Sequence, residues 1–185
     1  MRNVLLALGL IAAVPLAACS KSAETPSGER TAAASAATDT LPDALGAAAN
    51  MKSIGTALTS TGLSGIFDGK GSYTVIAPTD AAFAKLGDAG TALMQPEQKS
   101  ALAAALREHI VPGELTLVDI GRAIDMAGDK AVKMRTMGSG DLTFRKAGDA
   151  IQVTSADGAS ATLAGPEIRG KGSVAIPADT VLRKL

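Results

Sequence analysis

Aromatic residues are scarce in this chain, which has no tryptophan, one tyrosine and three phenylalanines. Sites that bind sugars or single-stranded nucleic acids by stacking use aromatic rings as platforms, so the composition argues against such sites. The 18 basic residues are balanced by 18 acidic residues, which leaves no overall positive charge to attract a phosphate backbone. We therefore expect no nucleic-acid partner.

Histidine and cysteine each occur once, as His109 and Cys19. A multi-histidine zinc site is excluded by this count, and no intrachain disulfide can form. The run from Gly165 to Lys171 has the glycine and lysine spacing of a phosphate loop, but Gly172 stands where that loop needs serine or threonine. We expect no catalytic residue, no cofactor and no metal, and interpret His109 as a core residue bonded to backbone.

The N-terminus has the pattern of a secretory signal. Arg2 precedes an apolar run from Val4 to Leu16, which is shorter than the roughly 20 residues that a membrane-spanning helix needs. The run ends in Leu-Ala-Ala-Cys at residues 16–19, which resembles a bacterial lipobox that is cleaved before a cysteine to be lipidated. The alternative is an ordinary secretory signal with an incidental cysteine.

This pattern predicts three segments: a lipoprotein signal peptide at 1–18, a disordered tether at 19–40 and one globular domain at 41–185. The tether is rich in alanine, serine and threonine and has almost no bulky apolar residues to bury. Lipid on Cys19 would anchor the protein to the cell envelope. Ser20 in the second mature position, by analogy with Gram-negative sorting, favours the outer membrane, facing the periplasm or the cell surface.

Within the domain, helical spacing gives way to strand spacing. The short apolar and β-branched run Tyr73–Ala77 is typical of a strand buried on both faces. Thr116 and Asp119 have the spacing of a capping box that opens a helix. After residue 128 the apolar period falls from about 3.6 to 2. Further strands are expected at 132–135, 142–145, 151–153, 161–163 and 174–176, with residues 181–182 closing the sheet. Helices followed by antiparallel strands indicate an α+β fold.

The segment Thr-Val-Ile-Ala-Pro-Thr-Asp-Ala-Ala-Phe at residues 74–83 resembles the first motif of the fasciclin-like (FAS1) domain. Its physical role is readable from the residues, because a buried strand must turn sharply into a capped helix whose phenylalanine enters the core. The matching residues are Thr74, Val75, Ala77, Pro78, Thr79, Asp80 and Phe83. A second family motif, Tyr-His-Val-Val-Pro-Gly, is matched at His109, Pro112 and Gly113, with Glu108 in place of tyrosine.

The third motif is followed loosely at residues 171–182, where Pro177 is expected to interrupt strand pairing as an edge or bulge. Pro166, Glu167 and Ile168 lie where some matrix relatives carry an adhesion segment. The resemblance implies N-terminal helices packed on a mostly antiparallel β-sheet or wedge-shaped β-sandwich.

The resemblance also implies a monomeric, non-catalytic module for adhesion or for contact with an unidentified protein or matrix partner. The loops around Pro112 and around residues 165–172, together with Glu108, are the expected contact surface. The alternative is an envelope protein that binds or carries a small apolar molecule in an enclosed pocket.

Overall fold

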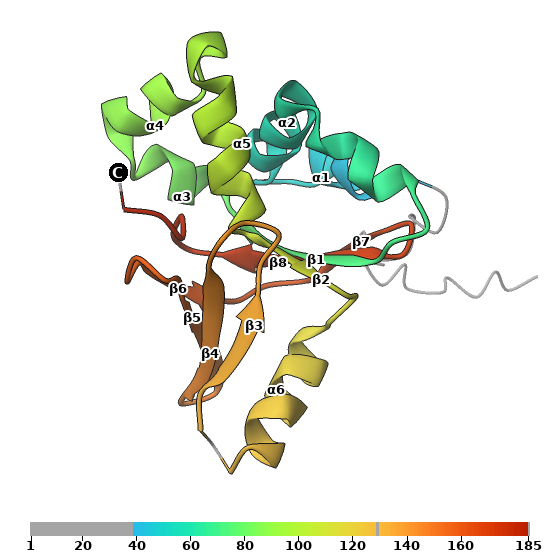
Figure 1. Cartoon of the computed structure of the whole chain (residues 1–185), viewed down its shortest axis with the longest axis vertical. Coiled ribbons are helices and arrows are strands. Elements are labelled where there is room, and N and C mark those ends of the chain that lie inside the picture. The colour runs from blue at the N-terminus through green and yellow to red at the C-terminus, as the bar shows by residue number, and fades with distance from the viewer. Residues whose placement is uncertain (1–38, 129, 185) are drawn as a thin grey trace, which may run out of the picture.

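The computed structural model describes residues 39–128 and 130–184. The predicted signal peptide, the lipidation site Cys19, Ser20 and nearly all of the tether lie outside these residues. Figure 1 shows helices gathered on one side of a sheet whose strands continue into a second, steeply inclined arm, with one helix beside that arm. The chain is therefore α+β, as the sequence predicts.

All helices of the described residues lie between Leu41 and Met126, with two strands among them. They are α1 (Leu41–Ala47), α2 (Lys52–Thr61), η1 (Leu63–Asp68), α3 (Asp80–Ala84), α4 (Gly87–Leu93), η2 (Pro96–Gln98), α5 (Lys99–Arg107) and α6 (Leu117–Met126). Gly62 ends α2 in the left-handed conformation, and the capping box of Thr116 and Asp119 opens α6.

The strands form one mixed sheet with the order β2-β1-β8-β6-β5-β4-β3, and β7 pairs with β8 off this path. Their bounds are β1 (Tyr73–Pro78), β2 (Ile110–Pro112), β3 (Val132–Arg135), β4 (Asp141–Ala147), β5 (Ala150–Thr154), β6 (Ser160–Leu163), β7 (Ile168–Gly170) and β8 (Ser173–Ala178). Every pairing is antiparallel except that of β1 with β8.

The prediction that Pro177 interrupts pairing is wrong, because β8 runs through it beside Ala77 of β1. Proline lacks only the backbone N–H, and the carbonyl of Pro177 still accepts a hydrogen bond from the N–H of Ala164 at 3.1 Å. The hydrogen bond from β8 to its neighbour at this position uses the carbonyl and needs no N–H donor, so proline is tolerated inside the sheet.

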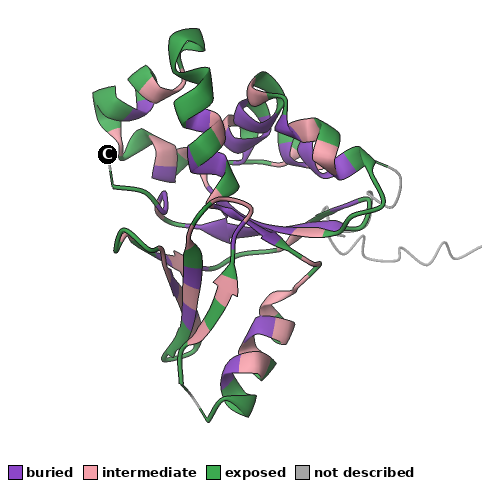
Figure 2. Cartoon of the chain, in the orientation of Figure 1, coloured by how far each residue is buried: buried purple, intermediate pink, exposed green. Residues whose placement is uncertain are grey.

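Strands β1 and β8 separate two apolar cores. On the helical side, Val75 and Ala77 of β1 pack with the inner faces of α1, α2 and α5. On the other side, Ile76 of β1 and Ile176 of β8 pack with α6 and the apolar faces of β4, β5 and β6. Figure 2 shows the buried colour along β1 and β8, as expected for strands covered on both faces.

The end of the described chain differs from its prediction. Val181 and Leu182 are buried but form no strand. The N–H of Leu182 instead donates to the Nε2 atom of His109 at 2.9 Å, so a side chain takes the place of a strand partner.

The start of the described chain lies against β7. The carbonyl of Asp39 accepts a hydrogen bond from the N–H of Lys171 at 2.9 Å, and a Cβ on Gly170 would lie 2.4 Å from the backbone of Leu41. The described residues just before α1 are thus held against the end of β7.

Candidate functional site

The first motif forms the central strand and ties it to the second motif. Val75 and Ala77 are fully buried, and Pro78 is buried at the end of β1. The hydroxyl of Thr74 donates to the carbonyl of Gly113 at 2.7 Å and accepts from the N–H of Leu115 at 2.7 Å. Thr74 therefore fixes the loop that follows β2.

The corner after β1 caps two helices at once. The Thr79 hydroxyl accepts from the N–H of Ala82 at the start of α3, at 3.2 Å. The Asp80 carboxylate accepts from the N–H of Ser53 in the first turn of α2, at 2.7 Å. Burial alone would raise the pKa of Asp80, but the hydrogen bonds from Ser53 outweigh it and hold the pKa below its ordinary value. Phe83 is half-buried and packs against the helical core.

His109 is buried and its ring is bonded at both nitrogens. Nε2 accepts from the N–H of Leu182, so Nδ1 carries the proton and donates to the carbonyl of Ala105 at 2.9 Å. Burial lowers the pKa of His109, because the charged ring would have to leave water. This neutral, fully bonded ring links the end of α5 to the end of the chain and leaves no free nitrogen for catalysis.

We expect His109 to make stability depend on pH. Its pKa is lower in the folded chain than in the unfolded chain, where it is about 6.5, so the stabilisation is complete above that pH and is lost as the pH falls toward the folded pKa. The loss should reach about 1.4 kcal/mol per pH unit below 6.5 at most. Urea unfolding between about pH 7 and pH 5 measures it. The His109→Gln variant should have a flatter profile there, and equal slopes in the two proteins would contradict the assignment.

Glu108 replaces the tyrosine of the family motif and closes the turn between β3 and β4. Its carboxylate accepts from the backbone N–H groups of Ser139 at 2.8 Å and Gly140 at 3.1 Å, and from the hydroxyl of Thr136 at 3.0 Å. Burial by itself would raise the pKa of Glu108, but these donors hold the pKa below its ordinary value. A Cβ on Gly138 would lie 2.3 Å from the carboxylate, so glycine leaves room for it. The carboxylate is thus occupied by the chain's own donors.

The two loops that the sequence singles out lie together. Arg169 donates to Glu114 at 3.1 Å and to Glu167 at 3.0 Å, and the second oxygen of Glu167 accepts from the N–H of Leu117 at 2.7 Å. Glu167 therefore holds the start of α6 against β7. Pro112 and Pro166 are exposed beside this cluster, while Ile168 is half-buried in the helical core. The cluster of Glu114, Glu167 and Arg169 with its two flanking prolines is called the loop surface below.

Two hollows on the helical side are open to solvent. One, of about 460 Å³, lies between α1 and α2, and the other, of about 570 Å³, lies between the start of α2 and helices α3 and α4. Neither has the enclosed shape expected of a carrier for an apolar molecule. Within the described residues, no group of histidine, cysteine and carboxylate side chains is arranged to hold a metal ion.

Sequence reasoning missed the outer face of strands β3 to β6. Alternation along these strands sends one set of side chains into the core and the other set outward. The outward set contains hydroxyl, amide, cationic and carboxylate groups and no bulky apolar side chain. The alternation of apolar and polar residues indicated that these strands have an outer face. Alternation alone does not show which outward residues of different strands become neighbours.

No helix in residues 39–128 or 130–184 is both long and apolar enough to cross a membrane.

Comparisons with known proteins agree with this architecture. A family model of the fasciclin domain matches residues 49–184. A 64-residue stretch is 42% identical to Protein sll1483 of Synechocystis sp., covering 32% of this chain and 35% of that protein. The structure of a FAS1 domain pair from the insect cell adhesion molecule fasciclin I matches with a TM-score of 0.65 and 13% identity, over 79% of this chain and 51% of that one.

The chain spans about a third of the curated relative and about half of the fasciclin I pair. The low identity to fasciclin I supports the fold, and the family match extends over most of the described residues. The chain belongs to the fasciclin (FAS1) domain family, a family of adhesion and interaction modules.

Proposed function

We propose that this chain is a lipid-anchored protein of the cell envelope whose FAS1 domain is a non-catalytic module for adhesion or protein contact. The lipobox-like sequence before Cys19 supports the anchor, and Ser20 favours the outer membrane if the cell has one. The partner is a protein or a component of an extracellular matrix, and the domain acts as a monomer. The fully bonded, neutral ring of His109 supports the absence of catalysis.

The loop surface carries the proposal of a contact site. It joins residues 112–117 with residues 165–172, which are far apart in the sequence, through the ion pair of Arg169 with Glu114 and the hydrogen bond from the N–H of Leu117 to Glu167. Because these side chains are held by one another and by the N–H of Leu117, the loops meet a partner in one conformation and lose little entropy on binding. A preformed surface of this kind suits an interaction module.

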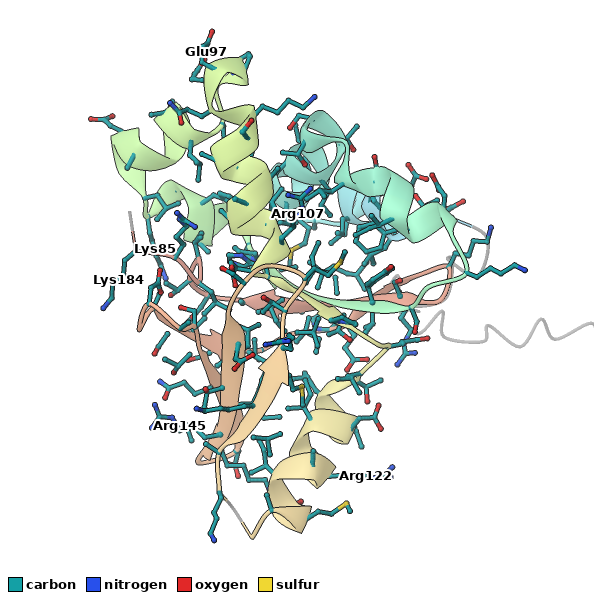
Figure 3. All side chains as sticks on the ribbon, viewed as in Figure 1. Lys85, Glu97, Arg107, Arg122, Arg145 and Lys184 are labelled. Carbon is teal, nitrogen blue, oxygen red and sulfur yellow. The ribbon has the colours of Figure 1, made fainter. Side chains whose placement is uncertain are left out.

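Reversing the charge of Arg169 tests the contact site. The Arg169→Glu variant places three carboxylates together and should separate the two loops, lowering the yield of cross-linked partner from intact cells by about tenfold. Arg122→Glu, which makes the same charge change on the exposed side of α6 (Figure 3), is the control and should capture the partner normally. Equal yields from both variants, with unchanged circular dichroism, would overturn the site.

The anchor has its own test. Replacing Cys19 with alanine removes the thiol that would carry the lipid, so the protein should move from the membrane pellet to the soluble fraction on cell fractionation. The matched control is Ser20→Ala, which keeps the thiol and should remain in the pellet. A Cys19→Ala protein that still sediments with membranes would count against lipid anchoring.

A further inference from the structure

The outer face of strands β3 to β6 carries polar side chains in rows across the sheet. The register pairs Thr143 of β4 with Lys133 of β3 on one side and with Thr154 of β5 on the other, and Thr154 pairs with Ser160 of β6. The Thr154 and Ser160 hydroxyl oxygens lie 2.9 Å apart, which confirms that they share a face. Strands lie about 4.8 Å apart, so this row spans roughly 14 Å.

A second row runs parallel to the first. Arg145 of β4 lies beside Gln152 of β5, which lies beside Thr162 of β6. Beyond the edge of β6, the ammonium group of Lys85 donates to the carbonyl of Asp179 at 2.8 Å, and the carboxylate of Asp179 accepts from the N–H of Thr162. The second row therefore has hydroxyl and amide groups in the middle, Arg145 at one end, and Lys85 with the carboxylate of Asp179 at the other.

The cations on this side are exposed, whereas the nearby acids are engaged. Lys133 and Arg145 are exposed, and Figure 3 shows Arg145, Lys184 and Lys85 along the same side of the molecule. The carboxylate of Asp157 accepts from the hydroxyl of Ser155 and from the backbone N–H groups of residues 159 and 184, so its position is fixed at the end of the sheet. Asp141 is the acid on the sheet face itself, 4.0 Å from Arg135.

We propose that this sheet face binds an acidic polysaccharide, an extended chain of hexoses that carries carboxylate groups. Hydroxyl and amide groups in rows fit the alternating donors and acceptors of sugar hydroxyls, and the flanking cations fit carboxylates. The face has no large apolar side chain at its centre, which distinguishes it from a typical protein interface. It has no aromatic platform, so charge and hydrogen bonds provide the recognition and stacking does not.

The proposed binding face lies on the side of the domain opposite to the first described residue. The described chain begins at Asp39 against β7, and Figure 1 places β7 on the opposite side of the molecule from β4 to β6. The proposed binding face therefore lies away from Asp39, the first described residue. Each contact is solvent-exposed and weak, so several domains on one polymer would bind through avidity.

The test compares polymers that differ in charge. The full chain is immobilised, and binding of polygalacturonate and of dextran, a neutral hexose polymer, is measured by surface plasmon resonance. Polygalacturonate should bind, dextran should not, and added salt should weaken the binding. The double variant Lys133→Gln/Arg145→Gln should bind polygalacturonate about tenfold more weakly.

The control variant has the same change in net charge away from this face. Arg107→Gln/Arg122→Gln removes two exposed cations from helices that Figure 3 shows on other parts of the molecule, and it should bind normally. A third variant, Thr154→Val, keeps the charge and the strand shape but removes a central hydroxyl, and it should also weaken binding. Absence of polygalacturonate binding, equal binding of dextran, or an equal loss in the control and face variants would each overturn the proposal. None of these outcomes bears on the loop surface, because Arg169 is unchanged in every variant.

Discussion

Replacing His109 with alanine is expected to lower the free energy of unfolding by about 4 kcal/mol. The ring is buried and fills space between α5 and the end of the chain, so its removal leaves a cavity. It also removes the acceptor of the Leu182 N–H, which is left buried and unsatisfied. Urea unfolding followed by circular dichroism measures the change.

An exposed residue next to this site provides the control. Arg107→Ala, two positions earlier at the end of α5, should change stability by less than about 0.5 kcal/mol, because the side chain is exposed. At temperatures where the His109→Ala protein is still folded, it should capture a partner as well as the wild type. A variant of full stability that loses partner binding would instead assign His109 to the contact surface.

Replacing Gly170 with alanine is expected to cost about 3 kcal/mol. The new Cβ would lie 2.4 Å from both the N and the Cα atoms of Leu41, and backbone cannot move aside as a flexible side chain can. Helix α1 would have to shift, and with it Leu41 and Leu45, which are fully buried. Hydrogen exchange should show the largest loss of protection in α1 and β7.

Gly46→Ala, in the same helix as Leu41, is the control. Gly46 lies in α1 with open space where its Cβ would be, and alanine is the better helix former, so this variant should be as stable as the wild type or more stable. If Gly170→Ala unfolds at the same urea concentration as Gly46→Ala, the close approach of β7 to the start of α1 does not exist in solution.

Local chemistry explains why much of the fold follows from the sequence. Tyr73–Ala77 is apolar or β-branched throughout and becomes a strand covered on both faces. Thr79 and the pair Thr116–Asp119 cap helices where short polar side chains precede an apolar pattern. The alternation of apolar with polar residues in β3, β4 and β5 becomes an inner and an outer face. In each case the interactions that determine the element are between residues close together in the sequence.

Features that depend on distant segments were not predicted. Strands β2 and β7 are three residues each, too short for a period to show, and exist because β1 and β8 offer them partners. Helix α4 contains Gly87 and Gly90, poor helix formers, and was missed for that reason. Pro177 is tolerated because of the particular neighbour of its carbonyl, Ala164.

In the candidate sites, too, the sequence identified local features but not the contacts between distant segments. The two loops of the loop surface were singled out from the sequence, but the ion pair of Arg169 with Glu114 and the hydrogen bond of Glu167 with Leu117 that join them were not. Glu108 was interpreted as a possible contact residue, whereas its carboxylate is enclosed by the turn at residues 136–140. Only the three-dimensional register shows that Lys133, Thr143 and Thr154 form a row.

The parallel pairing of β1 with β8 has a consequence for how the protein is made. Tyr73 and Ser173 are register partners separated by 100 residues, so the central strand of the domain has no neighbour on one side until the final strand has been synthesised. An unfinished chain cannot close its core, so its apolar surface stays accessible to chaperones. If the N-terminal segment is the export signal that we propose, this late completion favours a chain that is still unfolded when it reaches the secretion channel.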